Sequence, residues 1–518
     1  MKKLTKFWLS LIIVVMAFVI VGCDSSNNGN NGNNGNNGNN GDNGNDNDGV
    51  PCSTDMNQEK CYDPETWDWE LNRSEFDGKQ MEIKIMVNPA YEYDPFDKDY
   101  TGTRQTERQE WHTRVEAAYN IKIKYEEYPT EASWGPPRIQ WITEAHTGGI
   151  PNRGEIYLID TNWISTFIKA GAISELYNSR TKKGFFADFN YTQDKVYMDM
   201  TSIQGKTYGY LLGEARPDFY LYYNQDLIDS LNLPDPATLW NEGKWDWTAF
   251  TSLLATAKTK LPEGSYPMGG VAADVIQGLV AARGGKFVDQ GLKKVLLSNP
   301  TVVKAVEDLQ EVYKLYWDKE QQHSDVGGNF ISGKTLFASG SLWYLKSNIR
   351  FGPAEFKISA VPFPTETGDA AAKANFKIPV GFSAGYAIKP LENGPNGLNS
   401  KIIFNILDDL MRGLKPEVKA TEGSADERYR IWLKQRIDSE ESIEALMSVQ
   451  NSKYYHLELL QTVSMTVGNG SHFKGDAWYV FSLPLLVNTD GNLSPQVELD
   501  RIQPVYEAAY ASIIGDTD

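Results

Sequence analysis

A serine flanked by two glycines is the feature of this sequence with the clearest chemical potential. Residues 381–385 read Gly-Phe-Ser-Ala-Gly, the Gly-x-Ser-x-Gly pattern of a hydrolase nucleophile elbow, and His456 and His472 follow in a plausible triad order. The elbow needs a helix directly after the serine, yet residues 386–390 read Tyr-Ala-Ile-Lys-Pro, which predicts a short strand stopped by proline. We therefore expect Ser383 to be a turn residue without a nucleophilic role. A secreted serine hydrolase is the rival class.

The other residues able to do chemistry form no recognisable constellation. The five histidines are scattered, without His-x-x-x-His spacing or a cysteine partner, so no catalytic zinc is expected. A glycosidase carboxylate pair has no fixed spacing in sequence, and nothing among the 68 acidic residues singles one out. Residues 46–49 resemble part of a calcium loop, but no glutamate follows at its twelfth position. The sequence predicts neither an enzyme nor a bound metal or cofactor.

Length, composition and charge limit the classes of protein to which the chain can belong. A chain of 518 residues can bury one large core or two lobes, and its 41% hydrophobic content is that of an ordinary globular protein. The formal net charge of −18 argues against a nucleic-acid partner, because phosphate binding needs a basic surface.

The N-terminus carries an export signal. Residues 1–6 are basic and residues 7–21 form an apolar run of signal-peptide length. The run ends in Ile-Val-Gly-Cys at residues 20–23, which resembles the lipobox of bacterial lipoproteins. That resemblance implies cleavage before Cys23 and diacylation of its thiol; a plain secretory signal is the alternative.

The next segment predicts a tether. Residues 24–49 are Asn-Gly repeats with scattered Asp and no apolar side chain, so we expect them to stay disordered. In residues 51–78, Cys52 and Cys61 would lie outside the membrane, where disulfides persist and can close a short loop. A local disulfide is the default expectation and free thiols are the alternative.

The sequence after residue 78 predicts βαβ units and hence an α/β fold. Alternating apolar runs indicate strands over 81–87, 121–125 and 156–159, and the stretches between them indicate helices over 104–119 and 137–146. Asp160, Thr161, Asn162 and Trp163 follow the third strand, where open parallel sheets place their ligands. Equally, Asn162 could cap the next helix while Trp163 packs on it.

The downstream half predicts a second, helix-rich part followed by a return to strands. We expect helices over 247–260, 274–283 and 300–317, with Asn299 as a cap, and strands over 219–223, 358–363 and 385–388. Two further helices are expected over 401–411 and 504–514.

Several stretches resemble the large family of extracellular solute-binding proteins that serve carbohydrate importers and include maltose-binding protein. They are residues 155–176, the Tyr-Asn-Gln-Asp-Leu of 223–227, the tryptophan-rich 239–247, the Phe-x-x-Gly-x-Thr…Trp of 330–343, and 379–385. In order and spacing they cover most of residues 79–415.

The resemblance implies a type II periplasmic-binding-protein fold with two discontinuous lobes. Residues 79–216 and 381–415 would form the first lobe and residues 217–380 the second. Residues 416–518 would be a helical region belonging mostly to the second lobe, and 415–475 have no counterpart that aligns.

The resemblance also implies a set of ligand-binding residues. They are Asn162, Trp163, Arg216, Asp218, Asp274, Trp343 and Phe382. Arg216 and Asp218 could instead form a hinge ion pair, and Trp343 could instead be a core residue under the hinge. Asp274 stands where relatives have an aromatic residue, which leaves the identity of the sugar open.

The function implied is that of a binding protein for an ABC importer. A carbohydrate, expected to be an oligosaccharide, would bind between two closing lobes and pass to permease subunits without a covalent step. The 14 tryptophans and 27 tyrosines suit this role, because sugar rings present an apolar face to aromatic side chains. We expect a monomer anchored by lipid on Cys23 to the outer face of the cell membrane. Peptides or other polar solutes are the alternative ligands.

Overall fold

The computed structural model describes residues 80–148, 153–185, 195–211, 215–319, 328–347, 350–380, 384–414, 418, 421–467, 485–486 and 491–515. The chain divides into two units, Met1–Val50 and Pro51–Asp518, and every element below belongs to the second. Cys23, the expected lipidation residue, and the pair Cys52 and Cys61 lie outside the described residues.

A four-stranded sheet forms the centre of the part that we call lobe 1. Its strands are β1 (Met81–Val87), β2 (Ile121–Glu127), β3 (Ile156–Asp160) and β15 (Ala384–Ile388), in the order β15-β3-β1-β2. β1 pairs in parallel with β2 and with β3, and β15 is antiparallel to β3. The predicted early βαβ units are therefore confirmed.

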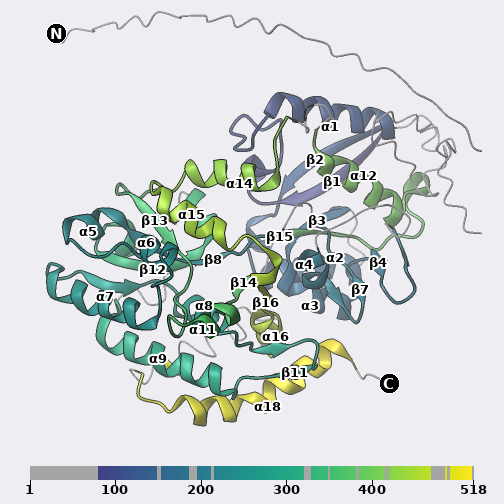
Figure 1. Cartoon of the computed structure of the whole chain (residues 1–518). Coiled ribbons are helices and arrows are strands. Elements are labelled where there is room, and N and C mark those ends of the chain that lie inside the picture. The colour runs from purple at the N-terminus through teal and green to yellow at the C-terminus, as the bar shows by residue number, and fades with distance from the viewer. Residues whose placement is uncertain are drawn as a thin grey trace, which may run out of the picture. The chain divides into compact units, whose positions relative to one another are not determined.

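Helices cover both faces of this sheet (Figure 1). α1 (Gln105–Tyr119) and α12 (Ser400–Arg412) share one hydrophobic core with one face, while α2 (Pro136–Thr147) and α3 (Ile164–Lys169) share a second core with the other. The apolar residues of α12 recur at helical spacing, which explains why one side of this helix is buried: Ile402, Ile403, Ile406, Leu407 and Leu410.

A small antiparallel sheet extends lobe 1 beside α4 (Lys195–Met200). Its strands are β4 (Tyr177–Asn178), β5 (Lys183–Gly184), β6 (Ser202–Ile203) and β7 (Lys206–Thr207), in the order β5-β4-β7-β6.

A second four-stranded sheet forms the centre of lobe 2. Its strands are β8 (Phe219–Asn224), β9 (Tyr266–Gly269), β12 (Thr335–Ser341) and β13 (Ile358–Val361), in the order β13-β8-β12-β9. Every residue of β8 is buried, as expected of a central strand with helices on both faces.

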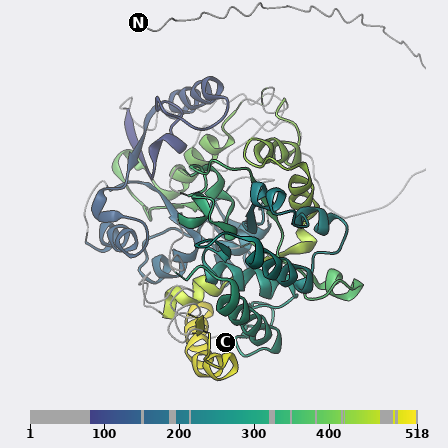
Figure 2. The ribbon, with the colours of Figure 1, turned by 90° about the vertical axis from the view of Figure 1, so that its left-hand side faces the viewer.

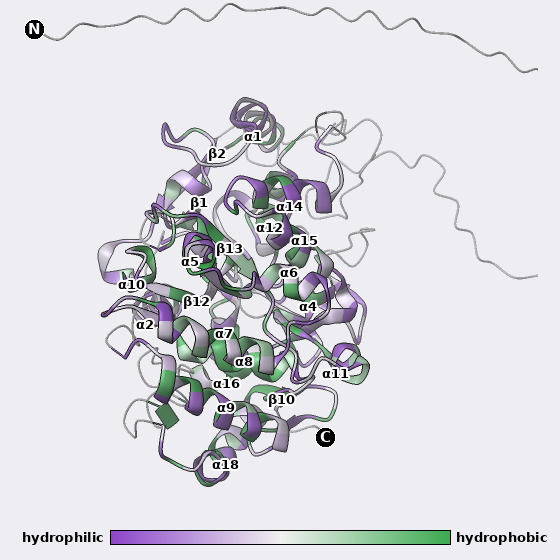
Figure 3. Cartoon of the chain, turned by 60° about the vertical axis from the view of Figure 1, so that its left-hand side comes forward, coloured by the Kyte–Doolittle hydropathy of each residue, from purple (hydrophilic) through white to green (hydrophobic). Residues whose placement is uncertain are grey.

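Five helices follow the strands of lobe 2: α5 (Gln225–Ser230), α6 (Pro236–Asn241), α7 (Trp247–Lys260), α8 (Ala272–Ala282) and α9 (Pro300–Tyr316). α8 is almost wholly apolar and buried, and it is the green helix near the middle of Figure 3. Asn299 caps α9 through Thr301 N, as its sequence predicts. The hairpin of β10 (Val288–Asp289) and β11 (Lys294–Val295) precedes α9.

The last hundred residues add helices whose side chains join the hydrophobic core of lobe 2. The elements are α14 (Ala425–Lys434), α15 (Glu440–Ser448), β16 (Tyr455–Leu457), α16 (Leu460–Val467) and α18 (Pro495–Ile514), and β16 pairs in parallel with β14 (Ile378–Val380). α18 lies beside α9 (Figures 1 and 2).

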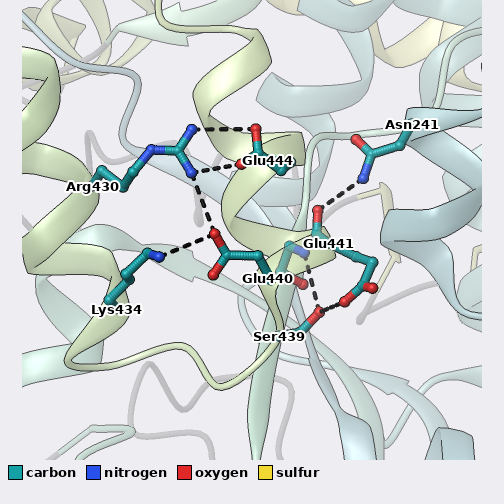
Figure 4. A network of polar contacts seen from close by, with 8 residues as sticks. Asn241, Arg430, Lys434, Ser439, Glu440, Glu441 and Glu444 are labelled. Carbon is teal, nitrogen blue, oxygen red and sulfur yellow. Dashed lines mark hydrogen bonds and ion pairs between the residues drawn. The ribbon is translucent and has the colours of Figure 1, made fainter.

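An ion-pair network holds α14 and α15 together (Figure 4). Arg430 contacts Glu444 at 2.6 Å and Glu440 at 3.5 Å, and Lys434 contacts Glu440 at 3.1 Å. Asn241, at the end of α6, donates a hydrogen bond to the Glu441 carbonyl at 3.0 Å, which ties this helix pair to lobe 2.

The start of the last helix corrects the sequence analysis. The sequence predicts the last helix over 504–514, with Pro504 as its first residue, a position that tolerates proline because its N–H has no helical partner. In the structure α18 begins at Pro495 and runs through Pro504. Buried residues on both sides of Pro504, including Leu499 and Tyr506, hold the helix against lobe 2 and outweigh the lost hydrogen bond.

Candidate functional site

The carboxyl ends of three parallel strands meet at one edge of the lobe 1 sheet. β1, β2 and β3 end there, and the short 3₁₀ turns η2 (Ala90–Glu92) and η4 (Thr161–Trp163) follow β1 and β3. In open α/β sheets this edge is where ligands bind. The sequence-predicted residues Asn162 and Trp163 therefore lie at the expected edge.

Asn162 is held from two sides. Its backbone N–H donates to Asp160 Oδ1 at 2.9 Å, and its side-chain Oδ1 accepts a hydrogen bond from Thr462 Oγ1 of α16 at 2.8 Å. Asp160 caps the η4 turn, and the next helix, α3, has Trp163 at its N-cap position without a side-chain cap hydrogen bond, so the expectation that Asn162 caps that helix is wrong. Burial raises the pKa of the Asp160 carboxyl to about 7, against the opposing effect of its hydrogen bonds with Asn162.

Trp163 lies beneath a second tryptophan. Trp163 is only 2% exposed, whereas Trp134 is 45% exposed, and their ring centroids are 4.7 Å apart. The buried Arg138 guanidinium lies 5.0 Å from the Trp134 ring and 4.0 Å from the Tyr128 ring. Trp134 is therefore the member of this pair that can contact a ligand.

Trp343 presents an aromatic surface at the edge of the lobe 2 sheet. It lies in η5 (Leu342–Lys346), which directly follows β12, and is 37% exposed. Its ring packs edge-on against Tyr344 at 4.6 Å, and the Arg350 guanidinium lies 5.2 Å from it. This exposure fits the ligand-facing interpretation of Trp343 better than the core interpretation.

An ion pair joins turn η5 of lobe 2 to turn η2 of lobe 1. Lys346 Nζ of η5 lies 2.8 Å from Glu92 Oε2 of η2, and Tyr91, beside Glu92, is 38% exposed. The turn that carries Trp343 therefore lies against the strand-end edge of lobe 1.

Arg216 and Asp218 lie on the segment that enters β8. Arg216 Nη1 forms an ion pair with Asp426 of α14 at 2.7 Å, and its guanidinium lies 4.9 Å from the Tyr429 ring. Asp218 Oδ1 accepts a hydrogen bond from Leu342 N at 3.0 Å, and burial raises its pKa to about 6. Arg216 thus bonds to the C-terminal region, and Asp218 fixes the turn that carries Trp343.

Two predicted ligand residues remain, Asp274 and Phe382. Asp274 lies in the first turn of α8 and is partly buried. Phe382 and Ser383 lie outside the described residues.

The segment after Ser383 does not match a nucleophile elbow. Residues from Ala384 form strand β15, paired with β3, where the elbow requires a helix. His456 lies in β16, with Nε2 3.3 Å from Glu458 Oε2, while His472 is outside the described residues.

Among the described residues, no group of three or more His, Cys, Asp or Glu is placed to hold a metal ion. Within the same ranges no helix combines the length and apolar character needed to cross a membrane.

The chain has two α/β lobes, each with strand ends of the kind at which ligands bind. This is the architecture of the two-lobed solute-binding proteins. The model of the family described as bacterial extracellular solute-binding protein matches residues 110–388, more than half of the chain. The chain belongs to this family.

Solved structures with the same fold have low sequence identity. The substrate-binding protein Lmo0181 of Listeria monocytogenes, in complex with cycloalternan, is 14% identical, with 84% of this chain and 98% of that chain covered and a TM-score of 0.51. The cyclic α-maltosyl-1,6-maltose binding protein of Arthrobacter globiformis is 13% identical, with 83% and 99% covered and a TM-score of 0.53.

UgpB of Mycobacterium tuberculosis, in complex with glycerophosphocholine, is 17% identical, with 83% of this chain and 98% of that chain covered and a TM-score of 0.54. No curated protein matches the sequence.

Sequence reasoning missed two features of this site. Trp134 lies seven residues after β2, and a tryptophan that follows a parallel strand is a signal that could have identified it. The Glu92–Lys346 pair joins residues 254 positions apart, and nothing in either local sequence indicates the partner.

Proposed function

We propose that this protein is the substrate-binding lipoprotein of an ABC importer and that it holds an oligosaccharide between its two lobes. Asn162, Asp274, Trp343 and Phe382 are proposed to contact the ligand, and the buried Trp163 is proposed to support the site through its contact with Trp134. To the ligand contacts we add Trp134, because it is the exposed member of this tryptophan pair.

The observation that carries the proposal is the partial exposure of aromatic rings at the ligand edges of both lobes. Trp134 in lobe 1 and Trp343 in lobe 2 each have a guanidinium near the ring, from Arg138 and Arg350. Aromatic faces stack on the apolar faces of sugar rings, and nearby planar polar groups suit sugar hydroxyls. The pairing of an apolar face with polar neighbours is typical of small-molecule sites.

The bound molecules of the structural neighbours support a sugar. Cycloalternan is the ligand in the Listeria protein, and cyclic α-maltosyl-1,6-maltose is named for the Arthrobacter protein. The glycerophosphocholine of UgpB is why another polar solute remains the second candidate.

The proposed mechanism has no covalent step. Closure of the lobes would desolvate the ligand contacts and create the shape that permease subunits recognise. Lipid on Cys23 would keep the binding protein at the outer face of the membrane, and residues 24–49 would act as its tether. A disulfide between Cys52 and Cys61 would close a loop ahead of lobe 1.

A thermal-shift screen with linear and cyclic oligosaccharides tests the ligand class. A ligand at 100 times its dissociation constant stabilises the folded chain by about 2.7 kcal/mol, so a true ligand raises the melting temperature clearly. We expect at least one oligosaccharide to do so in the wild type and to lose most of this effect in Trp343→Ala. Stabilisation only by peptides or by a phosphodiester would reject the carbohydrate assignment.

Treatment with a fluorophosphonate tests the absence of covalent chemistry. We expect no label on Ser383 and no ester hydrolysis. Labelling of Ser383, with hydrolysis lost in Ser383→Ala, would replace the binding-protein assignment with a hydrolase.

A further inference from the structure

A pocket of about 400 Å³ is lined by residues on both sides of the Asn162–Trp163 pair, among them Thr161 and Ile164. From lobe 1 it is lined by α3, α4 and the turns of the small β4–β7 sheet, and from the other side by α16, α18 and the β10–β11 turn. None of the seven ligand residues predicted from sequence lines it, nor does Trp134. Its volume is in the range of small-molecule sites.

The inner wall of this pocket combines apolar side chains with an unsatisfied hydroxyl. Ile164, Ile203, Val463 and Ile513 are among its apolar lining residues. Ser165, also in the lining, is 3% exposed, and its Oγ has no hydrogen-bond partner among the described residues. A buried hydroxyl without a partner is destabilising, so a group that forms a hydrogen bond with it would be favoured there.

Two cations from opposite walls lie at the same pocket. Arg180 belongs to the β4–β5 turn and Lys293 to the β10–β11 turn, and neither has an ion-pair partner within the described ranges of the chain. Asp199, the acidic residue of the lining, is already paired with Lys195 at 2.6 Å. Both side chains are exposed, and together they place positive charge at this pocket in a chain with a net charge of −18.

We propose that this pocket is a second ligand site that binds a small organic anion. Arg180 and Lys293 would contact the anionic head, either a phosphate ester or a carboxylate, since both form charge-assisted hydrogen bonds with guanidinium and ammonium groups. The Ser165 hydroxyl would supply a further hydrogen bond, and the isoleucine and valine side chains would cover an apolar body. The pocket adjoins the sugar site proposed above, because Thr161 of η4 and Thr462, the hydrogen-bond partner of Asn162, both line it, but none of the proposed sugar contacts does.

Calorimetric titration of the full chain with phenyl phosphate and with benzoate tests this site at low ionic strength. We expect one molecule of at least one probe to bind per chain. Phenol, which lacks the anionic head, and inorganic phosphate, which lacks the apolar body, should each bind at least about tenfold more weakly. Which of the two anions binds more tightly assigns the head group.

Matched variants identify the residues responsible. Arg180→Gln and Lys293→Gln should each weaken binding by about tenfold or more. Lys294→Gln, which removes the neighbouring charge that does not line the pocket, should change affinity by less than about twofold. Ser165→Ala should weaken binding several-fold, and thermal melts should show that all four variants fold.

Two results would overturn the proposal. The first is no binding of either anion at millimolar concentration, and the second is equal weakening by Lys293→Gln and Lys294→Gln.

Discussion

Replacement of Trp343 by alanine separates a ligand-facing tryptophan from a core tryptophan. Trp343 is 37% exposed, and a tryptophan offers up to about 250 Å² of surface, so a sugar could cover about 90 Å² of the ring. At about 25 cal/mol per Å² this contact contributes about 2.3 kcal/mol to binding. Because about 1.4 kcal/mol changes affinity tenfold, Trp343→Ala should weaken sugar binding by at least about tenfold.

The stability of the same variant provides the second readout. Trp163 is 2% exposed, so Trp163→Ala should lower the free energy of unfolding by about 3–5 kcal/mol, the usual loss for a buried aromatic residue. Trp343→Ala should lose clearly less than this control. Calorimetric titration with the sugar found by screening, together with urea unfolding of both variants, measures both quantities. Unchanged affinity in Trp343→Ala with a loss of stability equal to that of Trp163→Ala would refute the stacking role.

Three further perturbations test other parts of the account. Because burial raises the pKa of Asp160 to about 7 from 3.8, its ionisation opposes folding, and the folded chain should gain stability as pH falls from about 8 to about 5. Urea unfolding at both pH values should show a smaller gain in Asp160→Asn, by up to about 2.5 kcal/mol, and identical pH profiles would exclude the effect. The Glu92–Lys346 ion pair is partly exposed, so a double-mutant cycle should give a coupling free energy of at most about 1 kcal/mol. A larger value would contradict this expectation and show that the pair stabilises the contact between the lobes strongly. Cys23→Ser should release the protein from membranes, because two acyl chains give stable anchoring, and a variant that stays in the membrane fraction would reject the lipobox.

The strands and most helices could be predicted because their local patterns agree with their tertiary surroundings. β1 alternates in sequence and also has buried isoleucines on its inward face. α18 could not be bounded by such reasoning, since Pro504 carries a start signal that tertiary packing overrides. Local rules identify elements well where no long-range contact competes with them.

The candidate site was harder to predict, because contacts between distant segments decide which residues are free to bind. Trp163 satisfies the family pattern, yet Trp134 covers it in space. Arg216 could be placed at the lobe crossing, but its partner Asp426 lies in a region that has no aligned counterpart. Sequence position located the edge of the sheet, and only the fold shows which side chains are exposed there.

A crystal structure of the chain with its tightest-binding oligosaccharide tests the central claim most directly. The account predicts a sugar between the two lobes, with rings stacked on Trp134 and Trp343 and a polar contact to Asn162. A sugar bound elsewhere on the surface, with both tryptophans left uncovered, would contradict it.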